Sequence, residues 1–417
     1  MKNYDLIIIG AGASGLFAAG HASSKGLKVL LIEKMNRVGI KLSITGKGRC
    51  NICNTASQDE FYKHVGKNYR FLKYTFSKFY NNELLEYFAN IGIKTVVERG
   101  GRVFPESQKA TDVVNSLKKN ILKNKGEISY LNPVKNFILK DGEIVGIEAK
   151  LGKYYGENFL LCTGGKSYPL TGSTGDGYIF AKTLGHKIIP PIPALNAIEI
   201  EGNLPKKLQG LSLKNVSISV WINNKKKKDY FGEMIFTHFG ISGPIVLTIS
   251  KEFSHEIYSK ENMYFLLDLK PALDDKTLDK RLLREFESSG KKKVKSILKS
   301  LLPSKMINVV LAEIGLDAEK PGNQINSSER KSLKKWLKGI KLSLKSARPI
   351  SEAIITSGGI SLKDVVSTQM KSKLYDNLFF AGEILDFDAD TGGYNLQIAF
   401  STAFVAVESI LENKKSN

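Results

Sequence analysis

The sequence predicts an α/β fold in which the two ends of the chain build one domain and the middle forms an insert. Three observations favour it. A buried-strand run, Leu6-Ile-Ile-Ile9, leads into a glycine-rich turn, and small apolar residues from Leu16 to Ala22 continue as a helix. A second strand with a glycine and an acid, Phe380-Ala-Gly-Glu383, returns near the other end of the chain. Between them the alternation of strands and helices gives way to short β-like runs and then to helical periodicity.

The N-terminal strand, turn and helix have the pattern of a dinucleotide-binding fingerprint. In the turn Gly10-Ala-Gly12-Ala-Ser-Gly15, Gly10 permits the tight bend, Gly12 lets the backbone approach a pyrophosphate, and Gly15 allows close packing of helix on strand. The helix N-terminus supplies amide donors to the phosphates. A second strand, 28–32, ends at Glu33, whose carboxylate can accept both ribose hydroxyls. A glycine-rich turn without a ligand is the alternative.

Strand-like runs continue the α/β pattern to about residue 190, at 5–9, 28–32, 128–134 and 157–162. The three prolines in Ile188-Ile-Pro-Pro-Ile-Pro-Ala194 then break the pattern, because proline cannot continue a helix and is disfavoured in a central strand. We therefore predict a domain boundary at this segment.

The insert begins with β-like runs, such as Val216–Ile222 and Met263–Leu269, which predict a small antiparallel sheet or barrel. From 272 to 346 the period is helical, with apolar stripes at Val294, Ile297, Leu298, Leu301 and Leu302 and at Leu333, Trp336, Leu337 and Ile340. Segment 374–413 reads as a strand, a glycine loop and a closing helix. The predicted parts are 1–190 and 348–417 for the dinucleotide-binding domain, 191–271 for the β-rich insert and 272–347 for a basic helical insert.

Length and composition set the class of protein. With 417 residues the chain is long enough for two or three domains, and its apolar fraction of 42% is typical of a soluble globular protein. No apolar run of about 18 residues free of glycine or charge is present, and the N-terminus enters a strand at once, so we expect a cytoplasmic protein without a signal peptide. Three cysteines, an odd number, argue against a disulfide framework.

The net charge of +21 is unevenly distributed. Residues 202–228 contain seven lysines and no acid, and residues 271–350 contain 19 Lys and Arg against nine Asp and Glu, so these two stretches supply 17 of the 21 charges. Such asymmetry indicates a polyanionic partner such as nucleic acid, or less often an anionic membrane surface. A set of solvated lysine-rich helix faces is the alternative.

The C-terminal segments of the predicted site indicate which dinucleotide is bound. Cys162-Thr-Gly-Gly165 also ends a strand, yet no second strand and acid follow it, so the sequence predicts one bound dinucleotide. Nicotinamide dehydrogenases seldom need a strand–glycine–acid segment from the far end of the chain, whereas FAD enzymes return there to wrap the ribityl chain. The helix after Asn395 would then place its partial positive charge against the flavin pyrimidine. The predicted cofactor is a tightly bound FAD.

Five segments carry a more specific resemblance. They are Lys41-Leu-Ser-Ile-Thr-Gly-Lys-Gly-Arg-Cys-Asn51, Gly101-Arg-Val-Phe-Pro105, Thr163-Gly-Gly-Lys-Ser-Tyr-Pro169 with Thr171–Gly177, Phe236-Thr-His-Phe-Gly-Ile-Ser-Gly-Pro244, and Phe380–Glu383 with Thr391-Gly-Gly-Tyr-Asn395. In this order they resemble the RdsA/BaiN/aminoacetone-oxidase family of bacterial flavoproteins, over nearly the whole chain. The resemblance implies a Rossmann-type FAD domain of the two-dinucleotide-binding type, interrupted by an insert with β and helical parts.

The resemblance also implies the residues of the cofactor site. It makes Glu33 the adenosine ribose ligand, places Gly10–Gly15 at the pyrophosphate, and makes Val134 an adenine clamp, although a strand-end valine would look the same. The sequence departs from the family pattern at Ala389 and at Cys53. The candidate cofactor-binding residues are Gly10, Ala11, Gly12, Ala13, Ser14, Gly15, Glu33, Lys34, Lys41, Gly46, Arg49, Cys50, Asn51, Val134, Thr163, Gly164, Gly165, Asp176, Gly382, Glu383, Gly393, Tyr394, Asn395 and Leu396.

Cys50, His238 and Arg102 are the catalytic candidates. Cys50 beside a flavin could protonate a carbanion formed by hydride addition. A packing role, or a flavin-coupled dithiol with Cys53, is the alternative, and no metal is predicted because the further ligands of a zinc site are missing. His238 lies in an ordered turn before a helix, and Arg102 could hold a phosphate or carbonyl oxygen. A structural histidine and a surface arginine would look the same.

Three activities follow from the resemblance: reduction of a uridine in ribosomal RNA to dihydrouridine, reduction of a conjugated enone in steroid-like molecules, and oxidation of a small amine by oxygen. Charge favours the first, because RNA phosphates would pair with a basic insert and a steroid would not. The expected function is reduction of uridine in 23S rRNA with NADPH or NADH as a transient reductant. A small-molecule flavin oxidoreductase is the alternative, and no membrane partner is expected. The lysines expected to contact RNA are Lys225, Lys226, Lys227, Lys228, Lys292, Lys295 and Lys299.

Overall fold

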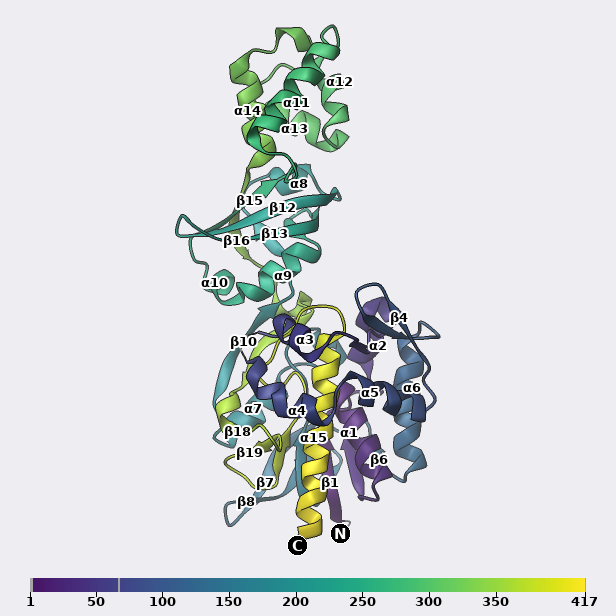
Figure 1. The fold of residues 1–417 in the computed structure, drawn as a ribbon. Coiled ribbons are helices and arrows are strands. Elements are labelled where there is room, and N and C mark those ends of the chain that lie inside the picture. The colour runs from purple at the N-terminus through teal and green to yellow at the C-terminus, as the bar shows by residue number, and fades with distance from the viewer. Residues whose placement is uncertain (1–2, 67, 417) are drawn as a thin grey trace. The chain divides into compact units, whose positions relative to one another are not determined.

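The computed structural model describes residues 3–66 and 68–416. It divides into two compact units: the first contains residues 1–194 and 350–417, and the second contains residues 195–349 (Figure 1). Each unit has its own hydrophobic core. The two ends of the chain therefore belong to one unit, and the second unit is inserted between them.

The first unit is built on a nine-stranded sheet whose main path is β18-β19-β20-β9-β1-β2-β6. Strand β1 lies between β2 and β9 and is parallel to both, and β20, from the C-terminal part of the chain, is parallel to β9. This order brings strands from both ends side by side, as in doubly wound dinucleotide-binding folds. The strands are β1 (Asn3–Ile9), β2 (Val29–Ile32), β6 (Glu127–Ser129), β7 (Val134–Lys140), β8 (Glu143–Ala149), β9 (Gly152–Leu161), β18 (Val365–Val366), β19 (Lys371–Ser372) and β20 (Leu378–Phe380).

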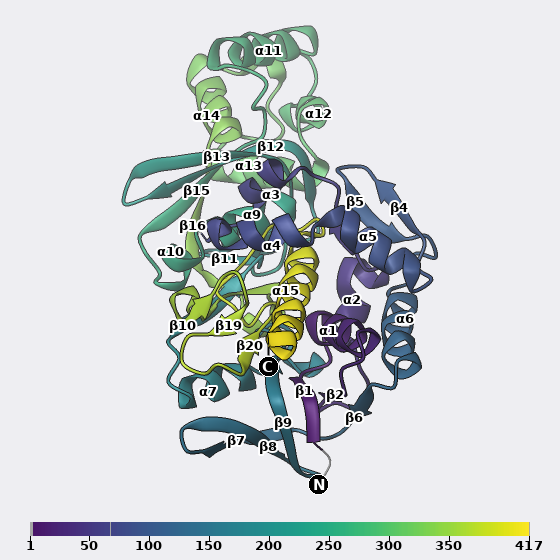
Figure 2. The same cartoon turned by 60° about the horizontal axis from the view of Figure 1, so that its bottom comes forward.

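Helix α15 (Tyr394–Ser416) packs against α1 (Ala13–Ser24), which also packs against α6 (Ala110–Lys123) (Figure 2). Small residues on α1 permit this close approach, since Ala18, Ala19 and Ala22 are all buried. By length and composition α15 is apolar enough to cross a membrane, but 72% of its apolar window is buried inside the structure. It is therefore accounted for as a core helix of the first unit.

A smaller sheet with the order β3-β5-β4 also belongs to the first unit. Its strands are antiparallel, with Cys53 opposite Val103 and Asn54 opposite Arg102. The three strands of this sheet and the other elements of the first unit up to residue 183 are α2 (Ile40–Gly48), β3 (Cys53–Asn54), α3 (Gln58–His64), η1 (Tyr69–Leu72), α4 (Lys73–Lys78), α5 (Asn81–Asn90), β4 (Thr95–Glu98), β5 (Arg102–Pro105), η2 (Pro169–Thr171) and α7 (Asp176–Thr183).

The structure corrects two expected elements of the first unit. The predicted strand 128–134 is two strands, β6 and β7, separated by a connection in which Leu131 has a positive φ of 51°. The proline segment expected to interrupt the pattern is a strand, β10 (Ile188–Ala194), antiparallel to β17 (Ile355–Ile360). It pairs with β17 alone and its register shifts between Ile189 and Ile192, so the intervening prolines need not donate ladder hydrogen bonds.

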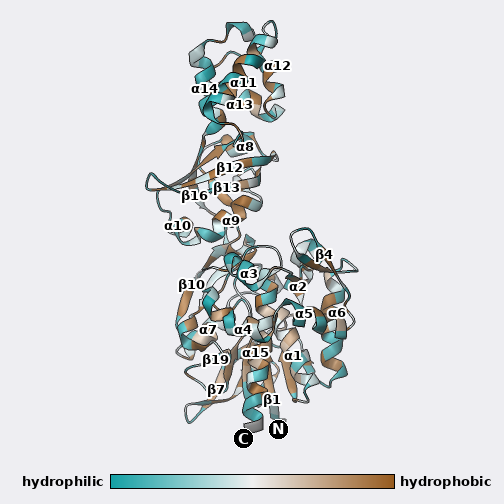
Figure 3. Cartoon of the chain, in the orientation of Figure 1, coloured by the Kyte–Doolittle hydropathy of each residue, from teal (hydrophilic) through white to brown (hydrophobic). Residues whose placement is uncertain are grey.

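The second unit contains a closed barrel of six strands in the order β11-β14-β13-β12-β15-β16. Buried apolar residues alternate along its strands, as on β12, where Val216, Ile218, Val220 and Ile222 are buried. Figure 3 shows hydrophobic segments in brown on the strands of this barrel. The unit's elements are β11 (Ile198–Ile200), α8 (Leu204–Lys207), β12 (Ser212–Ile222), β13 (Lys225–Phe236), β14 (Gly240–Ser242), α9 (Pro244–Glu252), α10 (Ser254–Tyr258), β15 (Met263–Asp268), α11 (Asp275–Ser288), α12 (Val294–Ile297), η3 (Leu298–Ser300), α13 (Ser304–Ile314), η4 (Gly322–Gln324), α14 (Ser327–Lys338) and β16 (Ile340–Ala347).

The predicted apolar stripes of the insert are buried in the core of the second unit, including Leu298 and Leu337. One member differs in structure, since α14 ends at Lys338 and Ile340 begins strand β16. Lys292, Lys295 and Lys299 are exposed, on the side away from their stripe. The fold class is confirmed: an α/β Rossmann-type domain interrupted by a small β-barrel with helices.

Candidate dinucleotide-binding site

The turn after β1 leaves no room for side chains at two of its glycines. A Cβ on Gly10 would lie 2.6 Å from the carbonyl oxygen of Cys162, and a Cβ on Gly15 would collide with the carbonyl oxygen of Gly10. At Gly12, by contrast, a Cβ would meet no described atom within 4 Å. Gly10 and Gly15 are therefore explained by packing, and Gly12 keeps open the space at the N-terminus of α1 where the fingerprint places a pyrophosphate.

Glu33 lies at the end of β2 and joins that strand to the turn. Its Oε2 accepts a hydrogen bond from the Ala11 amide at 2.8 Å, and its Oε1 accepts one from the Met35 amide at 2.8 Å. The Glu33 carbonyl accepts the amide of Asn132, two residues before β7 begins at Val134. The carboxylate predicted as the ribose ligand and the residue predicted as the adenine clamp thus lie on adjoining segments.

The C-terminal segment meets the N-terminal turn at Gly382. This residue has a φ of +81°, and a Cβ on it would collide with the hydroxyl oxygen of Ser14. The Gly382 amide donates to Thr402 Oγ1 at 3.0 Å, which fixes the turn on helix α15. A glycine is required here by both conformation and space, and through it both ends of the chain enter one site.

Lys41 and Glu383 form an ion pair, with Nζ 2.7 Å from Oε2. Lys41 Nζ also donates to Ser167 Oγ at 2.7 Å, and Glu383 Oε1 accepts from the Thr356 amide at 2.9 Å and from Ser167 Oγ at 3.2 Å. Each of these side chains comes from a different segment of the first unit. The network holds α2, the glycine segment after β9, β17 and the turn after β20 together.

The segment after β9 contributes a second crowded turn. A Cβ on Gly165 would collide with Thr356 Oγ1, and the neighbouring Gly164 has a φ of +72°. Thr163 Oγ1 is buried and has no hydrogen-bond partner within the described part of the chain. A buried hydroxyl without a partner is costly, which favours a missing ligand at this position.

Lys34 and Asp176 form an ion pair at 2.7 Å, and Thr174 Oγ1 bonds both of them. Asp176 is the first residue of α7, where its carboxylate is also favoured by the helix dipole. Its pKa is lowered, because the hydrogen bonds from Lys34 and Thr174 outweigh the opposing effect of burial. Both side chains were predicted as cofactor ligands, and here they bind each other.

Residues 46–51 form a tight loop against the small sheet. Gly46 and Cys50 have positive φ values of 57° and 63°, and a Cβ on Gly46 would lie 3.2 Å from the ring of Phe104. Asn51 Oδ1 is buried and has no partner among the described residues. Like Thr163 Oγ1, it is a polar atom whose burial favours a missing ligand.

Cys50 and Cys53 are both buried free thiols. Burial raises the pKa of Cys50 to about 12, against the opposing hydrogen bond with Thr45, and burial together with the nearby Cys50 raises the pKa of Cys53 to about 12. Both therefore stay protonated at neutral pH. No group of three or more His, Cys, Asp or Glu side chains that could hold a metal occurs within residues 3–66 and 68–416.

The loop before α15 uses its predicted ligands for internal contacts. The side-chain amide of Asn395 accepts from the Ala389 amide at 3.0 Å and donates to the Ala389 carbonyl at 2.8 Å. Tyr394 stacks on His64 with ring centroids 4.4 Å apart, and a Cβ on Gly393 would collide with the Cys53 carbonyl. Asn395 and Tyr394 thus shape the loop, and Leu396 packs partly buried against the core.

The three catalytic candidates have different surroundings. Cys50 is buried, Arg102 is partly exposed on β5, and His238 is exposed in the bend between β13 and β14 of the second unit. His238 has one described ring contact, with Phe239 at 4.9 Å. Cys50 and Arg102 are brought into the same unit, whereas His238 lies in the other unit.

Sequence reasoning missed two members of the Lys41–Glu383 network. Ser167 lies in the quoted segment Thr163–Pro169 and could have been found there, since its hydroxyl comes two residues after a pair of glycines. Thr356 follows Ile354-Ile355 in a segment without a local signal. It reaches the network because β17 pairs with β10 on one side and bonds to the turn after β20 at Ile384 and Asp386.

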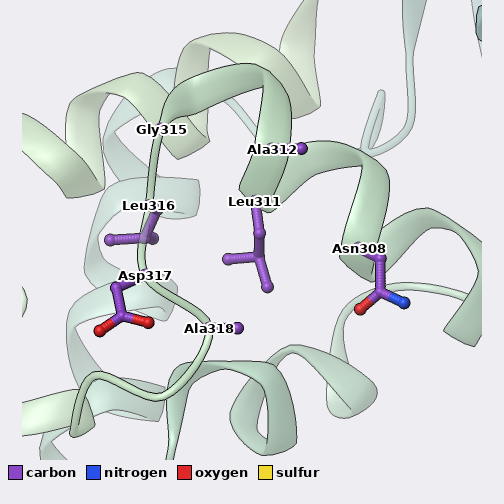
Figure 4. A pocket seen from close by; sticks show the side chains of 7 residues that line it. All are labelled: Asn308, Leu311, Ala312, Gly315, Leu316, Asp317 and Ala318. Atoms are coloured by element: carbon purple, nitrogen blue, oxygen red, sulfur yellow. The ribbon is translucent and has the colours of Figure 1, made fainter.

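A hollow of about 450 Å³ lies in the second unit, beside the C-terminal half of helix α13 and the segment 315–318 that follows it (Figure 4). Its lining is mostly apolar, with Asn308 and Asp317 as the polar members. No residue predicted for the cofactor or for catalysis lines it. The residues that line this hollow, all within 308–318, are therefore different from the residues of the candidate dinucleotide site.

Comparison with solved structures supports the fold. The 3-ketosteroid delta1-dehydrogenase from Sterolibacterium denitrificans superposes with a TM-score of 0.53, covering 99% of this chain and 100% of that chain. The two sequences are 13% identical. At this identity the likeness shows the shared fold alone.

Curated relatives match over nearly the full length. A protein of Clostridium scindens named 3-dehydro-bile acid delta(4,6)-reductase is 28% identical over 97% of this chain and 98% of its own. Proteins named ribosomal RNA dihydrouridine synthase are 29% identical in Haemophilus influenzae, over 97% of this chain and 98% of that one, and 26% identical in Escherichia coli, over 100% of both. The family model described as HI0933-like protein Rossmann domain matches residues 4–409. The resemblance drawn from the sequence motifs is confirmed, and the chain belongs to the HI0933-like family.

Proposed function

We propose that the protein is a cytoplasmic FAD-dependent oxidoreductase that reduces a uridine of 23S ribosomal RNA to dihydrouridine, with NADPH or NADH as the transient reductant. The proposal of FAD as the cofactor rests on the close approach of Ser14 and Gly382, which joins the N-terminal turn to the C-terminal segment. The proposal of ribosomal RNA as the substrate rests on the positive charge of residues 195–349 and on the names of two relatives that match over nearly their full length.

The residues present fit FAD. Gly12 leaves open the space for a pyrophosphate, and the buried Thr163 Oγ1 and Asn51 Oδ1 offer polar partners that no described residue uses. When bound, FAD would supply hydride transfer from its N5 to an activated carbon–carbon double bond. The amides at the N-terminus of α1 would hold the pyrophosphate, and Glu33 would accept the ribose hydroxyls while keeping its bonds to Ala11 and Met35.

Lys41 would act at the other end of the cofactor. The ion pair with Glu383 and the hydrogen bond to Ser167 hold its ammonium in one position. A fixed cation in a partly buried site stabilises negative charge more strongly than it would in water. We infer that Lys41 stabilises the more negative, reduced form of the cofactor and orients its ring.

Cys50 is our proposed proton donor to the reduced carbon. A thiol with a pKa raised to about 12 carries its proton at neutral pH, and a carbanion next to a carbonyl is basic enough to take it. The resulting thiolate would be costly while buried, so it must be reprotonated before the next turnover. Arg102 and His238 stay candidates for holding substrate oxygens.

Ribosomal RNA is the proposed partner of the second unit. Of the seven lysines predicted to contact it, Lys226 and Lys228 pair with Asp229 and Glu252. The other five have no ion-pair partner in the described chain and are exposed: Lys225, Lys227, Lys292, Lys295 and Lys299. Phosphates would compete for these free ammonium groups. The described residues form two units, neither of them a separate RNA-binding module, so the basic surface itself would be the contact.

Enone reduction is the second candidate, because the Clostridium scindens relative is named as a bile acid reductase. Both reactions add hydride and a proton to an activated double bond, and they differ in the substrate's charge. A neutral steroid-like acceptor would gain nothing from the basic insert.

Mass spectrometry of 23S rRNA from cells with and without the gene tests the proposal. Loss of dihydrouridine at one site in the deletion strain, restored by the wild-type gene, would support the RNA reaction. Unchanged dihydrouridine, combined with NADPH- or NADH-dependent reduction of an enone by the purified protein, would refute it in favour of the second candidate.

A further inference from the structure

A second cluster of positive charge lies in the first unit, on and beside the small sheet β3-β5-β4. It consists of Lys47, Arg49, Arg99 and Arg102, and we call it the arginine patch. One carboxylate, Glu98, lies between two of its guanidinium groups. This charge is separate in the chain from the lysine-rich stretches that we assign to ribosomal RNA.

The geometry of the patch is held from beneath by an aromatic ring. The Arg49 guanidinium lies 4.0 Å from the ring centroid of Phe104, and that of Arg102 lies 5.8 Å from it. Phe104 is buried, whereas 36% of the Arg49 side chain and 43% of the Arg102 side chain are exposed. Both guanidinium groups therefore have a fixed support and an open side.

Glu98 bridges the two arginines. Its Oε1 lies 2.8 Å from Arg49 Nη1, and its Oε2 lies 3.6 Å from Arg102 Nη2. Lys47 and Arg99 are exposed and have no ion-pair partner within residues 3–66 and 68–416. Two of the four cations thus share one carboxylate. Two phosphate oxygens can occupy the position of the Glu98 oxygens.

The patch borders the candidate cofactor site. Arg49 directly precedes Cys50 and Asn51 in the chain, and Arg102 pairs in register with Asn54 on β3. The side-chain amide of Asn54 donates to the Gly392 carbonyl at 3.0 Å, in the loop that leads into α15. The arginines are therefore connected to two groups of candidate cofactor-binding residues, 49–51 and 393–396.

We propose that the arginine patch binds a backbone phosphate of the RNA strand next to the uridine that is reduced, and that Glu98 occupies the phosphate position in the free protein. This inference rests on the proposed RNA function. Under this proposal two surfaces contact the RNA. The second unit supplies general affinity for RNA, and the arginine patch positions the reacting nucleotide. When a phosphate replaces Glu98, both arginines keep an anion, and the released carboxylate, whose side chain is already 31% exposed, turns to solvent.

The test compares two single-charge variants, E98Q and E106Q. Glu106 is exposed, follows β5 and makes no described side-chain contact, so its change removes the same charge without releasing an arginine. Binding of fluorescein-labelled oligouridylate to the full-length, FAD-loaded protein is measured by anisotropy at several salt concentrations. We expect E98Q to tighten binding by about tenfold and E106Q to change it far less. Equal tightening in both variants would be a net-charge effect and would overturn the proposal.

Two further variants separate this inference from the proposed function. We expect R102Q and R49Q to weaken binding and each to reduce the salt slope by about 0.7, with the free energy of urea unfolding measured as the control for folding. If they bind like wild type while K292Q/K295Q/K299Q binds more weakly, the arginine patch is refuted and the RNA function stands. If the wild-type protein does not bind oligouridylate at all, both proposals fail.

Discussion

The hydroxyl oxygen of Ser14 occupies the place where a side chain on Gly382 would stand, although 367 residues separate the two in the sequence. Ser14 is in the first turn of α1, and Gly382 follows β20. Because Gly382 has a φ of +81° as well, neither space nor conformation admits another residue. The contact ties the predicted pyrophosphate-binding turn to the C-terminal segment through the protein's own atoms.

Gly12→Ala tests the cofactor site without disturbing this contact. A Cβ at residue 12 meets no described atom within 4 Å, and Gly12 has a φ of −80°, which alanine adopts freely. We expect the unfolding free energy of the FAD-free protein to fall by at most about 1 kcal/mol, for the weaker helix cap. The added methyl would meet the pyrophosphate, so the Kd for FAD should rise about 100-fold or more.

Flavin absorbance per protein and equilibrium dialysis measure this effect. Gly339→Ala is the matched control, because Gly339 also has a negative φ and its nearest neighbour would be 3.7 Å away. It lies in the second unit and should leave FAD binding unchanged. An unchanged Kd in Gly12→Ala would show that the pyrophosphate lies elsewhere.

The Lys41–Glu383 ion pair should stabilise the first unit through a measurable coupling. The two side chains are only 21% and 22% exposed, so removing Lys41 leaves a poorly solvated carboxylate. We expect K41A to reduce the unfolding free energy by about 1–3 kcal/mol, and K41A/E383A to cost less than the sum of the single changes by about 1–2 kcal/mol.

Urea unfolding of the FAD-free variants gives this double-mutant cycle. The exposed pair Lys63–Glu60 provides the comparison, since solvent screens it, and its cycle should show no coupling beyond experimental error. Additive effects at Lys41 and Glu383 would mean that each is held by Ser167 and Thr356 and not by the other.

The sequence predicts those structural features of this protein whose pattern lies within a few adjacent residues. The turn at Gly10–Gly15, the acid after β2 and the return of the chain at β20 were all predicted, because each depends on a few adjacent residues in a strand–turn context. Strand β10 was not, because its prolines are tolerated only through the irregular pairing with β17. That pairing joins residues far apart in the sequence.

In the candidate site, too, local features are predicted from the sequence and long-range contacts are not. Glycines that need space can be recognised from their spacing, whereas the partners of polar side chains cannot. Asn395 was expected to face the cofactor, and its amide closes the loop at Ala389 instead. Thr356 has no motif at all, yet its amide bonds Glu383 and its hydroxyl accepts from the backbone after Gly165. Such roles are set by tertiary contacts.

The lysines beside the first helical stripe should control the salt dependence of RNA binding. Replacing Lys292, Lys295 and Lys299 by Gln removes three exposed charges without touching the buried stripe. We expect the slope of log Kd against log salt to fall by about 2, since each phosphate contact contributes about 0.7 to 0.9. The equivalent changes at Lys119, Lys123 and Lys140, which are exposed in the first unit, should have little effect. A similar loss in both triple variants would mean that net charge alone governs binding.

The buried thiol of Cys50 should make the protein less stable in alkali. Its pKa is raised by burial from 9.0 to about 12 in the fold, so only the unfolded chain ionises between these values, and stability present below pH 9 is lost as pH rises towards 12. In urea unfolding, C50A should lessen the loss by about 1.4 kcal/mol per pH unit in this interval. Ile52→Val also removes buried volume but no titratable group, so it should lower stability equally at all pH values. An unchanged pH slope in C50A would mean that Cys50 is solvated in the folded protein, and the proposed proton donor would then have an ordinary thiol pKa.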